Sequence, residues 1–307
     1  MNAPRRLPRR AIDGVLLLDK PLGLTSNAAL QSARRLYNAA KAGHTGTLDP
    51  LATGLLPLCF GEATKFAGEL LDADKTYAAT VRLGITTDTA DAEGQVLQTR
   101  PVQVSAQQVE AVLRGFTGEI LQVPPMYSAL KRDGKPLYAY AREGITLERA
   151  PRRITIHSIE LHQFCEDTLS LTVVCSKGTY IRTLAEDIGA ALGCGAHLQA
   201  LRRTCIGRLQ LDRAVPLLDL EALDQQQRDT RLLPADALLE GLPRAELDSN
   251  GALRLGHGQP VRWNGTAGRW RAYAQGAFLG LCELDEAGWL NPRRLIAATE
   301  ENTPANA

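Results

Sequence analysis

The chain has 307 residues, 44% of them hydrophobic and 22% charged, with a formal net charge of +1. This composition is that of a folded globular protein, and no apolar run approaches the roughly 20 residues of a membrane span. The net charge alone indicates no affinity for nucleic acid. However, residues 1–60 carry eight basic against three acidic side chains, and residues 121–210 carry twelve against eight. These two blocks either fold into one phosphate-facing surface or lie scattered on a solvated exterior.

The first predicted elements are an arm, a strand and a helix. Residues 1–13 hold four arginines among prolines and are expected to form a mobile arm that either touches phosphates or only aids solubility. The apolar run Val15–Leu18 predicts a buried strand, and Ser26 or Asn27 is expected to cap a helix that extends to Tyr37.

Residues 43–57 contain one acid, Asp49, in a segment that is otherwise uncharged and holds three glycines. Because Pro50 restricts Asp49 to extended or turn conformations, its carboxylate is predicted to lie on a loop. A solitary carboxylate on an apolar loop can act as a nucleophile or a general base. The alternative is a turn residue whose carboxylate bonds only the local backbone.

Strands and helices then alternate without a regular repeat. Ser105 and Gln108 form a predicted capping box for the helix that follows them. Residues 124–150 combine basic side chains with prolines and glycines and are interpreted as a basic excursion from a sheet. The other predictions are helices over 63–71, 181–188 and 217–231 and strands over 77–83, 169–175 and 206–211. This order predicts an α+β fold.

A domain boundary is predicted near residues 240–246. Beyond it, short strands separated by glycine-rich turns contain all three tryptophans, Trp263, Trp270 and Trp289. Clustered tryptophans supply core area to a small domain, or they stack on RNA bases.

Several motifs together resemble the tRNA pseudouridine synthase B family. They occur in family order at residues 14–27, 43–57, 61–66, 74–77, 83–91, 125–131, 176–183 and 195–203. The tail, at residues 258–261, 280–288 and 292–294, more loosely resembles the small β-barrel RNA-binding domain shared by pseudouridine synthases and archaeosine transglycosylases.

The resemblance implies a pseudouridine synthase fold, with a central mixed or antiparallel sheet flanked by helices and a small C-terminal β-barrel-like domain. The implied division is a basic arm at 1–13, a catalytic domain at 14–243, an RNA-binding domain at 244–300 and a tail at 301–307. The implied activity is isomerisation of uridine 55 in the T loop of tRNA to pseudouridine, by base flipping and Asp-dependent cleavage of the glycosidic bond.

The implied reaction requires no cofactor and no metal. The sequence has no Walker loop and no G-x-G-x-x-G opening a helix. The acidic stretch 88–94 mimics a calcium loop, but Thr99 stands where the closing glutamate would be needed. Six scattered cysteines without metal-ligand spacing favour a reducing cytosol.

The resemblance also assigns roles to single residues. Asp49 is the catalytic carboxylate and Arg182 its cationic partner, for which Glu186 is the competing local partner. Lys20 lies near the active site, or is a solvated lysine at a strand end. The remaining assignments concern RNA: Tyr77 stacks on the flipped base, Tyr180 and Leu201 line its pocket, His44 fills the space of the flipped nucleotides, and Arg202 and Arg203 meet phosphates.

Each of these residue types also has a structural reading: Tyr77 as a core tyrosine and His44 as a surface or core histidine. At the level of the whole chain, the rivals to the enzyme are a non-catalytic RNA-binding or tRNA-folding protein and a synthase acting on another RNA within a larger complex. The expected protein is a cytoplasmic monomer that binds the T stem-loop of tRNA and no membrane.

Overall fold

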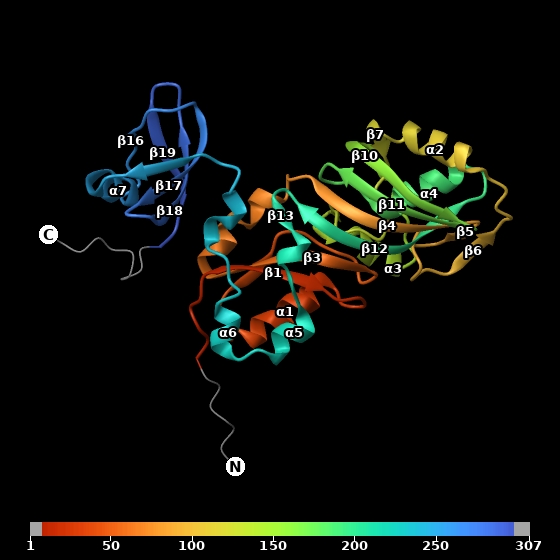
Figure 1. The fold of residues 1–307 in the computed structure, drawn as a ribbon, viewed down its shortest axis with the longest axis horizontal. Helices are drawn as coiled ribbons and strands as arrows, with labels where there is room; N and C mark the ends of the chain where they lie inside the picture. Colours follow the sequence, from red (N-terminus) through yellow and green to blue (C-terminus); the bar gives the residue numbers. More distant parts are fainter. Residues whose placement is uncertain (1–7, 298–307) are drawn as a thin grey trace, which may run out of the picture.

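The structure is a computed structural model that describes residues 8–297. It consists of a long curved sheet with helices packed on it and a smaller C-terminal sheet at one end of the molecule (Figure 1). The predicted α+β class is confirmed. Residues 1–7 of the predicted arm and the predicted tail at 301–307 lie outside the described residues. No helix among the described residues is long and apolar enough to cross a membrane.

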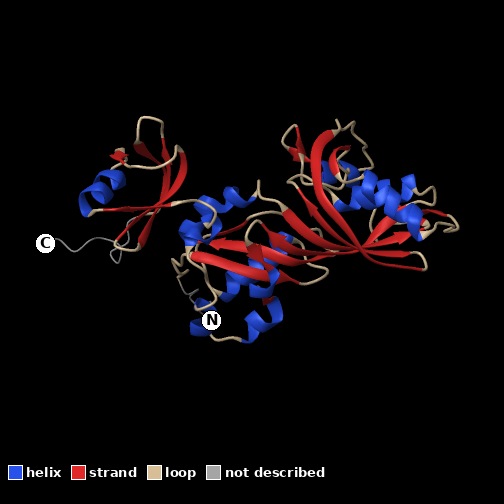
Figure 2. Ribbon diagram, turned by 45° about the horizontal axis from the view of Figure 1, so that its top comes forward, coloured by secondary structure: helices blue, strands red, loops and turns tan. Residues whose placement is uncertain are grey.

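The larger sheet is mixed, and its strands run continuously through the larger part of the molecule (Figure 2). Short β2 (Ala42–His44) pairs with β3, and β13 (Leu209–Gln210) pairs with β12. In spatial order the main strands are β14 (Val215–Pro216), β1 (Gly14–Lys20), β3 (Ala52–Phe60), β12 (Ala196–Ile206), β4 (Lys75–Leu83), β11 (Thr168–Cys175), β10 (Arg152–Cys165) and β7 (Gly118–Gln122).

Strand β12 joins the two halves of this sheet. It runs parallel to β3 and antiparallel to β4, so Leu201 is paired with Ala52 on one side and Ala79 on the other. The backbones of β3 and β12 approach closely at Gly54, where an added Cβ would lie 2.3 Å from the carbonyl oxygen of Arg203. The start of β3 is thereby held beside the middle of β12.

Both faces of the sheet are covered near β1, which explains its uninterrupted apolar run. Leu16 and Leu18 join a large core, and the alternate residues Val15 and Leu17 face a second core. The large core includes side chains of α1 (Ser26–Leu36), α2 (Ala106–Gly115), α4 (Ile181–Ala191) and α5 (Leu217–Ala222). The second includes the 3₁₀ helices η1 (Gly61–Leu70) and η3 (Ala235–Leu239).

Helix α1 begins one or two residues before the start that a cap at Ser26 or Asn27 predicts. Thr25 is the cap, and its side chain accepts a hydrogen bond from the backbone N–H of Ala28 at 3.1 Å. The prediction of Ser26 or Asn27 as the cap was wrong because the Ser26 hydroxyl has another partner. It accepts from the Leu48 N–H at 2.7 Å and donates to the Leu48 carbonyl at 3.0 Å.

Three other predictions need correction. The strand predicted over 206–211 is interrupted, because Ile206 ends β12 and Gly207, with a φ of 56°, turns the chain into β13 and then η2 (Leu211–Arg213). The helix predicted over 217–231 is two helices, because Leu223 is extended and Asp224 caps α6 (Gln225–Asp229).

The third correction concerns the arm, which is predicted as mobile but is fixed where it is described. Arg10 forms a 2.5 Å ion pair with Asp229, and its backbone exchanges hydrogen bonds with Asn38 and Ala40.

Two hairpins extend from the sheet. The first joins β5 (Ile85–Thr87) to β6 (Val96–Thr99), and the predicted excursion at 124–150 holds a second of β8 (Lys131–Arg132) and β9 (Lys135–Pro136), followed by α3 (Leu137–Arg142). The capping box at Ser105 and Gln108 is confirmed at the start of α2.

The smaller sheet has the order β15 (Arg244–Leu247), β17 (Gly268–Ala274), β18 (Ala277–Leu284), β19 (Trp289–Leu295) and β16 (Val261–Arg262), with α7 (Ser249–Gly256) packed on it. Trp263 and Trp270 meet edge to face with ring centroids 6.2 Å apart and pack against its core. Arg262 lies over the ring of Trp289.

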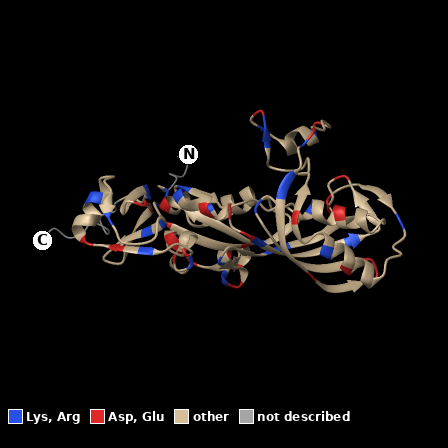
Figure 3. Cartoon of the chain, turned by 90° about the horizontal axis from the view of Figure 1, so that it is seen from above, with Lys and Arg blue, Asp and Glu red and all other residues tan. Residues whose placement is uncertain are grey.

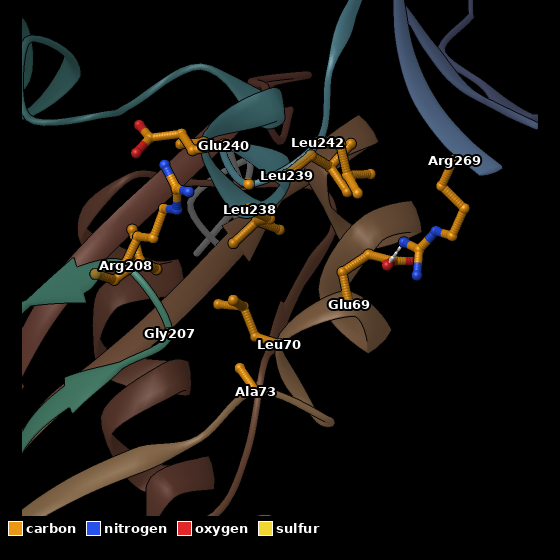
Figure 4. Close-up of a pocket in the computed structure, with 13 residues that line it drawn as sticks. Glu69, Leu70, Ala73, Gly207, Arg208, Leu238, Leu239, Glu240, Leu242 and Arg269 are labelled. Atoms are coloured by element: carbon orange, nitrogen blue, oxygen red, sulfur yellow. Dashed lines mark ion pairs between the residues drawn. The ribbon is translucent and has the colours of Figure 1, made fainter. Parts of the chain in front are cut away.

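The two sheets are joined by charged and apolar contacts. Arg269 of β17 pairs with Glu69 of η1 across a pocket where the two sheets meet (Figure 4). Phe278 of β18 packs on Phe66 of η1, with ring centroids 5.4 Å apart. The C-terminal sheet is therefore docked on the second core rather than tethered by a free linker.

Candidate active site

A pocket of about 220 Å³ opens between β3, β4, β12 and the start of α4. It combines the loop that precedes β3 with side chains from the middle of the sheet. Among its lining residues are Thr45, Gly46, Asp49, Leu71, Lys75, Tyr77, Ser128, Tyr180, Arg182, Leu201 and Arg203. Most of the residues singled out in the sequence therefore line one pocket, and the exceptions are Lys20, His44 and Arg202.

Asp49 lies on the predicted loop, shortly before β3. Its carboxylate Oδ2 is 3.0 Å from Nε of Arg182, and its side chain is 41% exposed. Arg182 is buried, and it is Asp49 rather than the local candidate Glu186 that forms an ion pair with it. The register of β3 and β12 brings Asp49 to this place, because Ala52 pairs with Leu201 and both residues line the pocket.

Arg182 is held by two segments besides the Asp49 loop, the turn of the first hairpin and the segment that contains Tyr127. Its Nη1 donates to the carbonyl of Thr89 at 3.2 Å and its Nη2 to the carbonyl of Tyr127 at 2.6 Å. Its Nε is also 3.6 Å from Oδ2 of Asp91, which is buried in the turn of the first hairpin. The guanidinium is therefore fixed in orientation, with its Nε aimed at two carboxylates.

The charge of Asp49 is set by opposing effects. Loss of hydration raises the pKa of the Asp49 carboxyl above its ordinary value, the Arg182 guanidinium opposes this rise, and Asp91 adds to it. A carboxylate whose pKa is raised is a stronger base than an ordinary aspartate. Such a group suits nucleophilic or basic chemistry.

The walls of the pocket are aromatic and aliphatic. Tyr77 and Leu201 come from neighbouring strands and are each 9% exposed, while Tyr180 stands at the N-terminal cap of α4. Burial raises the pKa of both tyrosine hydroxyls, so the rings are neutral. A flat, uncharged side chain beside a carboxylate can stack on a nucleobase.

Lys20 is completely buried and does not bond Asp49. Its ammonium donates to the carbonyls of Pro21, Leu24 and, at 3.5 Å, Pro50, which follows Asp49. Burial lowers the pKa of Lys20 to about 8, and the charge of Asp49 opposes this shift. The reading as a solvated strand-end lysine is wrong; Lys20 instead ties two loops beside the carboxylate.

Arg202 and Arg203 are not placed as expected for residues that meet phosphates at the surface. Arg202 forms a two-point ion pair with Asp19, at 2.6 and 3.1 Å, and does not line the pocket. Arg203 is 2% exposed, and its Nε donates to the carbonyl of Leu55 at 2.9 Å. A surface phosphate is therefore out of reach of Arg203. His44 ends β2 next to the pocket, and burial, with the charge of Arg203, lowers its pKa.

Buried polar atoms around the pocket lack partners within the described chain. They are His44 Nδ1, Thr45 Oγ1, Ser128 Oγ and Arg203 Nη2. Three of these groups have a neighbour that can partner them: the Tyr180 hydroxyl for Ser128, the Tyr77 hydroxyl for Arg203 and the Gly46 backbone for His44. They give the pocket polar groups beside its aromatic walls.

Asp91 is a site residue that the sequence analysis missed. It belongs to one of the family motifs, but its acidic stretch suggests only a mimic of a calcium loop. The sequence signal that could have identified Asp91 is an acidic residue among threonines in the turn of a hairpin. No group of His, Cys, Asp or Glu within residues 8–297 could hold a metal ion.

Family models of pseudouridine synthases match most of the chain. They cover residues 34–181 (TruB family pseudouridylate synthase, N terminal domain), 182–240 (tRNA pseudouridylate synthase B C-terminal domain) and 243–296 (Pseudouridine synthase II TruB, C-terminal). Relatives named tRNA pseudouridine synthase B include one from Dechloromonas aromatica (strain RCB), 59% identical over 94% of this chain and 96% of its own. Another, from Aromatoleum aromaticum (strain DSM 19018 / LMG 30748 / EbN1), is 61% identical over 95% of each chain.

Among solved structures, a chain of a Cbf5-Nop10-Gar1 complex superposes with a TM-score of 0.71 and 25% identity, over 92% of this chain and 84% of its own. A chain of a Nop10-Cbf5 complex gives a TM-score of 0.69 at 25% identity, over 92% of this chain and 85% of its own. Since identities near 60% extend over almost the full length, the chain belongs to the TruB family of pseudouridine synthases.

Proposed function

We propose that this protein converts uridine 55 in the T loop of tRNA to pseudouridine, with Asp49 as its catalytic residue. The observation that carries the proposal is the ion pair between Asp49 and Arg182 at an aromatic-lined pocket. Relatives that are about 60% identical over nearly the whole chain and are named tRNA pseudouridine synthase B support the same activity.

The reaction is an isomerisation and therefore balances without a co-reactant. The N1–C1′ bond breaks, a C5–C1′ bond forms, the C5 hydrogen leaves as a proton and N1 gains one. Asp49 acts as nucleophile or general base on the bound nucleotide. Arg182 holds the carboxylate charged and oriented, Asp91 and the carbonyls of Thr89 and Tyr127 hold Arg182, and Lys20 positions the loop that carries Asp49.

The substrate base has to leave its stack to reach Asp49. We assign stacking on the everted base to Tyr77 and the remaining pocket wall to Tyr180 and Leu201. Arg203 donates from Nη2 to an oxygen of the everted nucleotide, and His44 occupies the space vacated in the folded loop. We assign a phosphate contact to Arg202. It makes this contact either after leaving Asp19 or through the part of its side chain that is exposed.

The wider assignments follow from the same activity. We propose a catalytic domain at 14–243, with the excursion at 124–150 in contact with RNA, and an RNA-binding domain at 244–300. The protein acts as a monomer in the cytoplasm on the T stem-loop. The basic, exposed side chains of Lys131 and Arg132 support the role of the excursion.

Tritium release tests this function. A T stem-loop transcript labelled at uridine C5 should lose tritium to water with purified protein, without added metal or nucleotide. Asp49→Asn should bind the same RNA and release none. Release at the normal rate by Asp49→Asn would refute the catalytic assignment, and tight binding without release by the wild type would favour the RNA-binding rival.

A further inference from the structure

Gln122 is the last residue of β7 and is 2% exposed, although none of the motifs above includes it. Its side chain reaches across to the start of α4, 58 residues later in the chain. Oε1 accepts from the Tyr180 N–H at 2.8 Å, and Nε2 donates to the Tyr180 carbonyl at 3.1 Å. Both polar ends of the amide are thus used on the two backbone groups of a single residue.

Tyr180 depends on this contact because α4 has no side-chain cap of its own. The first backbone N–H groups of a helix have no partner within the helix and need one from elsewhere. Gln122 fixes both the N–H and the carbonyl of the cap residue, which sets the direction in which the helix starts. The Tyr180 ring and, two residues later, the Arg182 guanidinium both enter the pocket from this turn.

The same residue also joins α4 to the base of the basic excursion. Residue 122 is followed directly by the segment that contains Tyr127, whose carbonyl accepts from Arg182 at 2.6 Å. Arg182 is therefore positioned from both sides by one stretch of chain: through its helix by Gln122, and through its guanidinium by Tyr127. A shift at Gln122 would move both contacts together.

We propose that Gln122 is a positioning residue that aligns Arg182 with Asp49 and sets the orientation of Tyr180. The inference rests on the proposed function, since it concerns the same reaction. It predicts that loss of the amide lowers the rate of the chemical step and leaves RNA affinity nearly intact. A displacement of about 1 Å at a catalytic group can cost on the order of 10²-fold in rate.

Gln122→Met keeps the length and apolar stem of the side chain and removes both hydrogen bonds. We expect kcat for tritium release from the labelled T stem-loop to fall roughly 10- to 100-fold, with the dissociation constant for RNA unchanged. The acid limb of the pH profile should move to higher pH, because a misaligned Arg182 opposes the raised pKa of Asp49 less. Gln122→Asn, which keeps both polar groups on a shorter stem, should lie between wild type and Gln122→Met.

The matched control is Gln108→Met, which removes a similar side-chain contact to the backbone N–H of Ser105 at the start of α2. It should lower the melting temperature without changing kcat or the acid limb. If Gln122→Met and Gln122→Asn likewise change only the melting temperature, or weaken RNA binding at unchanged kcat, the positioning role is wrong. An inactive wild type would instead refute the proposed function itself.

Discussion

At the scale of single residues, the ionisation of Asp49 depends on Arg182. Arg182→Met removes the cation but retains an apolar stem in a buried site. We expect kcat to fall by roughly 10²- to 10³-fold, the loss typical of a group that stabilises charge in an active site. The acid limb of kcat/KM should also move to higher pH, because the guanidinium opposes the rise in the pKa of Asp49. Tritium release measured across pH checks both effects.

Arg82→Met is the matched control for this variant. Arg82 also forms an ion pair, with Asp167, but at the far end of β4. It should leave kcat and the acid limb unchanged. An equal shift of the acid limb in both variants would show that general electrostatics, and not the contact with Asp49, sets the profile.

The raised pKa of Asp49 also predicts a cost in stability. An acid whose pKa is higher in the folded than in the unfolded protein binds more protons when folded, so the free energy of unfolding falls as pH rises through that window. Asp49→Asn cannot ionise there. Its free energy of unfolding should therefore fall less than that of the wild type as pH rises from the ordinary pKa of 3.8 through the raised pKa. Urea denaturation across pH measures this difference, and an equal fall in both proteins would contradict it.

At the scale of elements, the loop that carries Asp49 is fastened to the start of α1. Ser26 bonds both backbone groups of Leu48, the residue before Asp49. Ser26→Ala leaves a buried N–H and a buried carbonyl unpaired, which should cost roughly 1–3 kcal/mol per group at most and lower kcat by loosening the loop. Thermal or urea denaturation combined with kcat measures both consequences.

Thr25→Ala provides the comparison within the same turn. It removes the helix cap, which costs about 1 kcal/mol, but leaves the contact with Leu48 in place. We expect kcat to remain at the wild-type value. If Thr25→Ala reduces kcat as much as Ser26→Ala does, the Leu48 contact has no separate role.

Local sequence patterns predicted those elements that have a clear periodicity of apolar residues or a clear helix cap. Alternation located β4 and β11, and the Ser105–Gln108 box located α2, because these signals act between near neighbours. Strand β12 escaped prediction because its central position allows buried Arg203 in a run that looks polar. The false strand over 206–211 ran through Gly207, whose turn depends on contacts with residues distant in sequence.

The candidate site was predicted mainly from the family resemblance rather than from local patterns. Asp49 stood out as a lone acid before proline, but its partner Arg182 is far away in the chain, and only the family resemblance linked the two. Asp91 carries only the weak signal of an acid among threonines, and Gln122 carries none that separates it from an ordinary strand-end residue. Their importance emerges from the contact of Asp91 with Arg182 and of Gln122 with the start of α4, which no short window of sequence contains.

At the scale of the whole molecule, basic and acidic residues are interspersed over the larger and the smaller sheet and the elements around them (Figure 3). RNA affinity should therefore depend on a few local clusters rather than on net charge. Replacing Lys131 and Arg132 by Met should weaken binding of the T stem-loop and reduce the slope of log K against log salt by about one for each phosphate that the protein no longer neutralises. Titrations at several salt concentrations measure the slope.

Arg114→Met is the control for this charge effect, since Arg114 is exposed on α2 and paired with Glu110. It should leave the slope unchanged. An unchanged slope in the Lys131 and Arg132 variant would remove the excursion from the RNA-binding surface, whereas a lower kcat at saturating RNA would give it a role in the chemical step.

The most direct measurement is a crystal structure of this protein with a T stem-loop that carries 5-fluorouridine at position 55. The structure should show the modified base turned out of the loop, stacked on Tyr77 beside Tyr180 and Leu201, with the Asp49 carboxylate in contact with the nucleotide and still paired with Arg182. A base that stays stacked within the RNA loop, or one that enters the pocket while Asp49 makes no contact with the nucleotide, would contradict the assignment of this carboxylate as the group that begins the reaction.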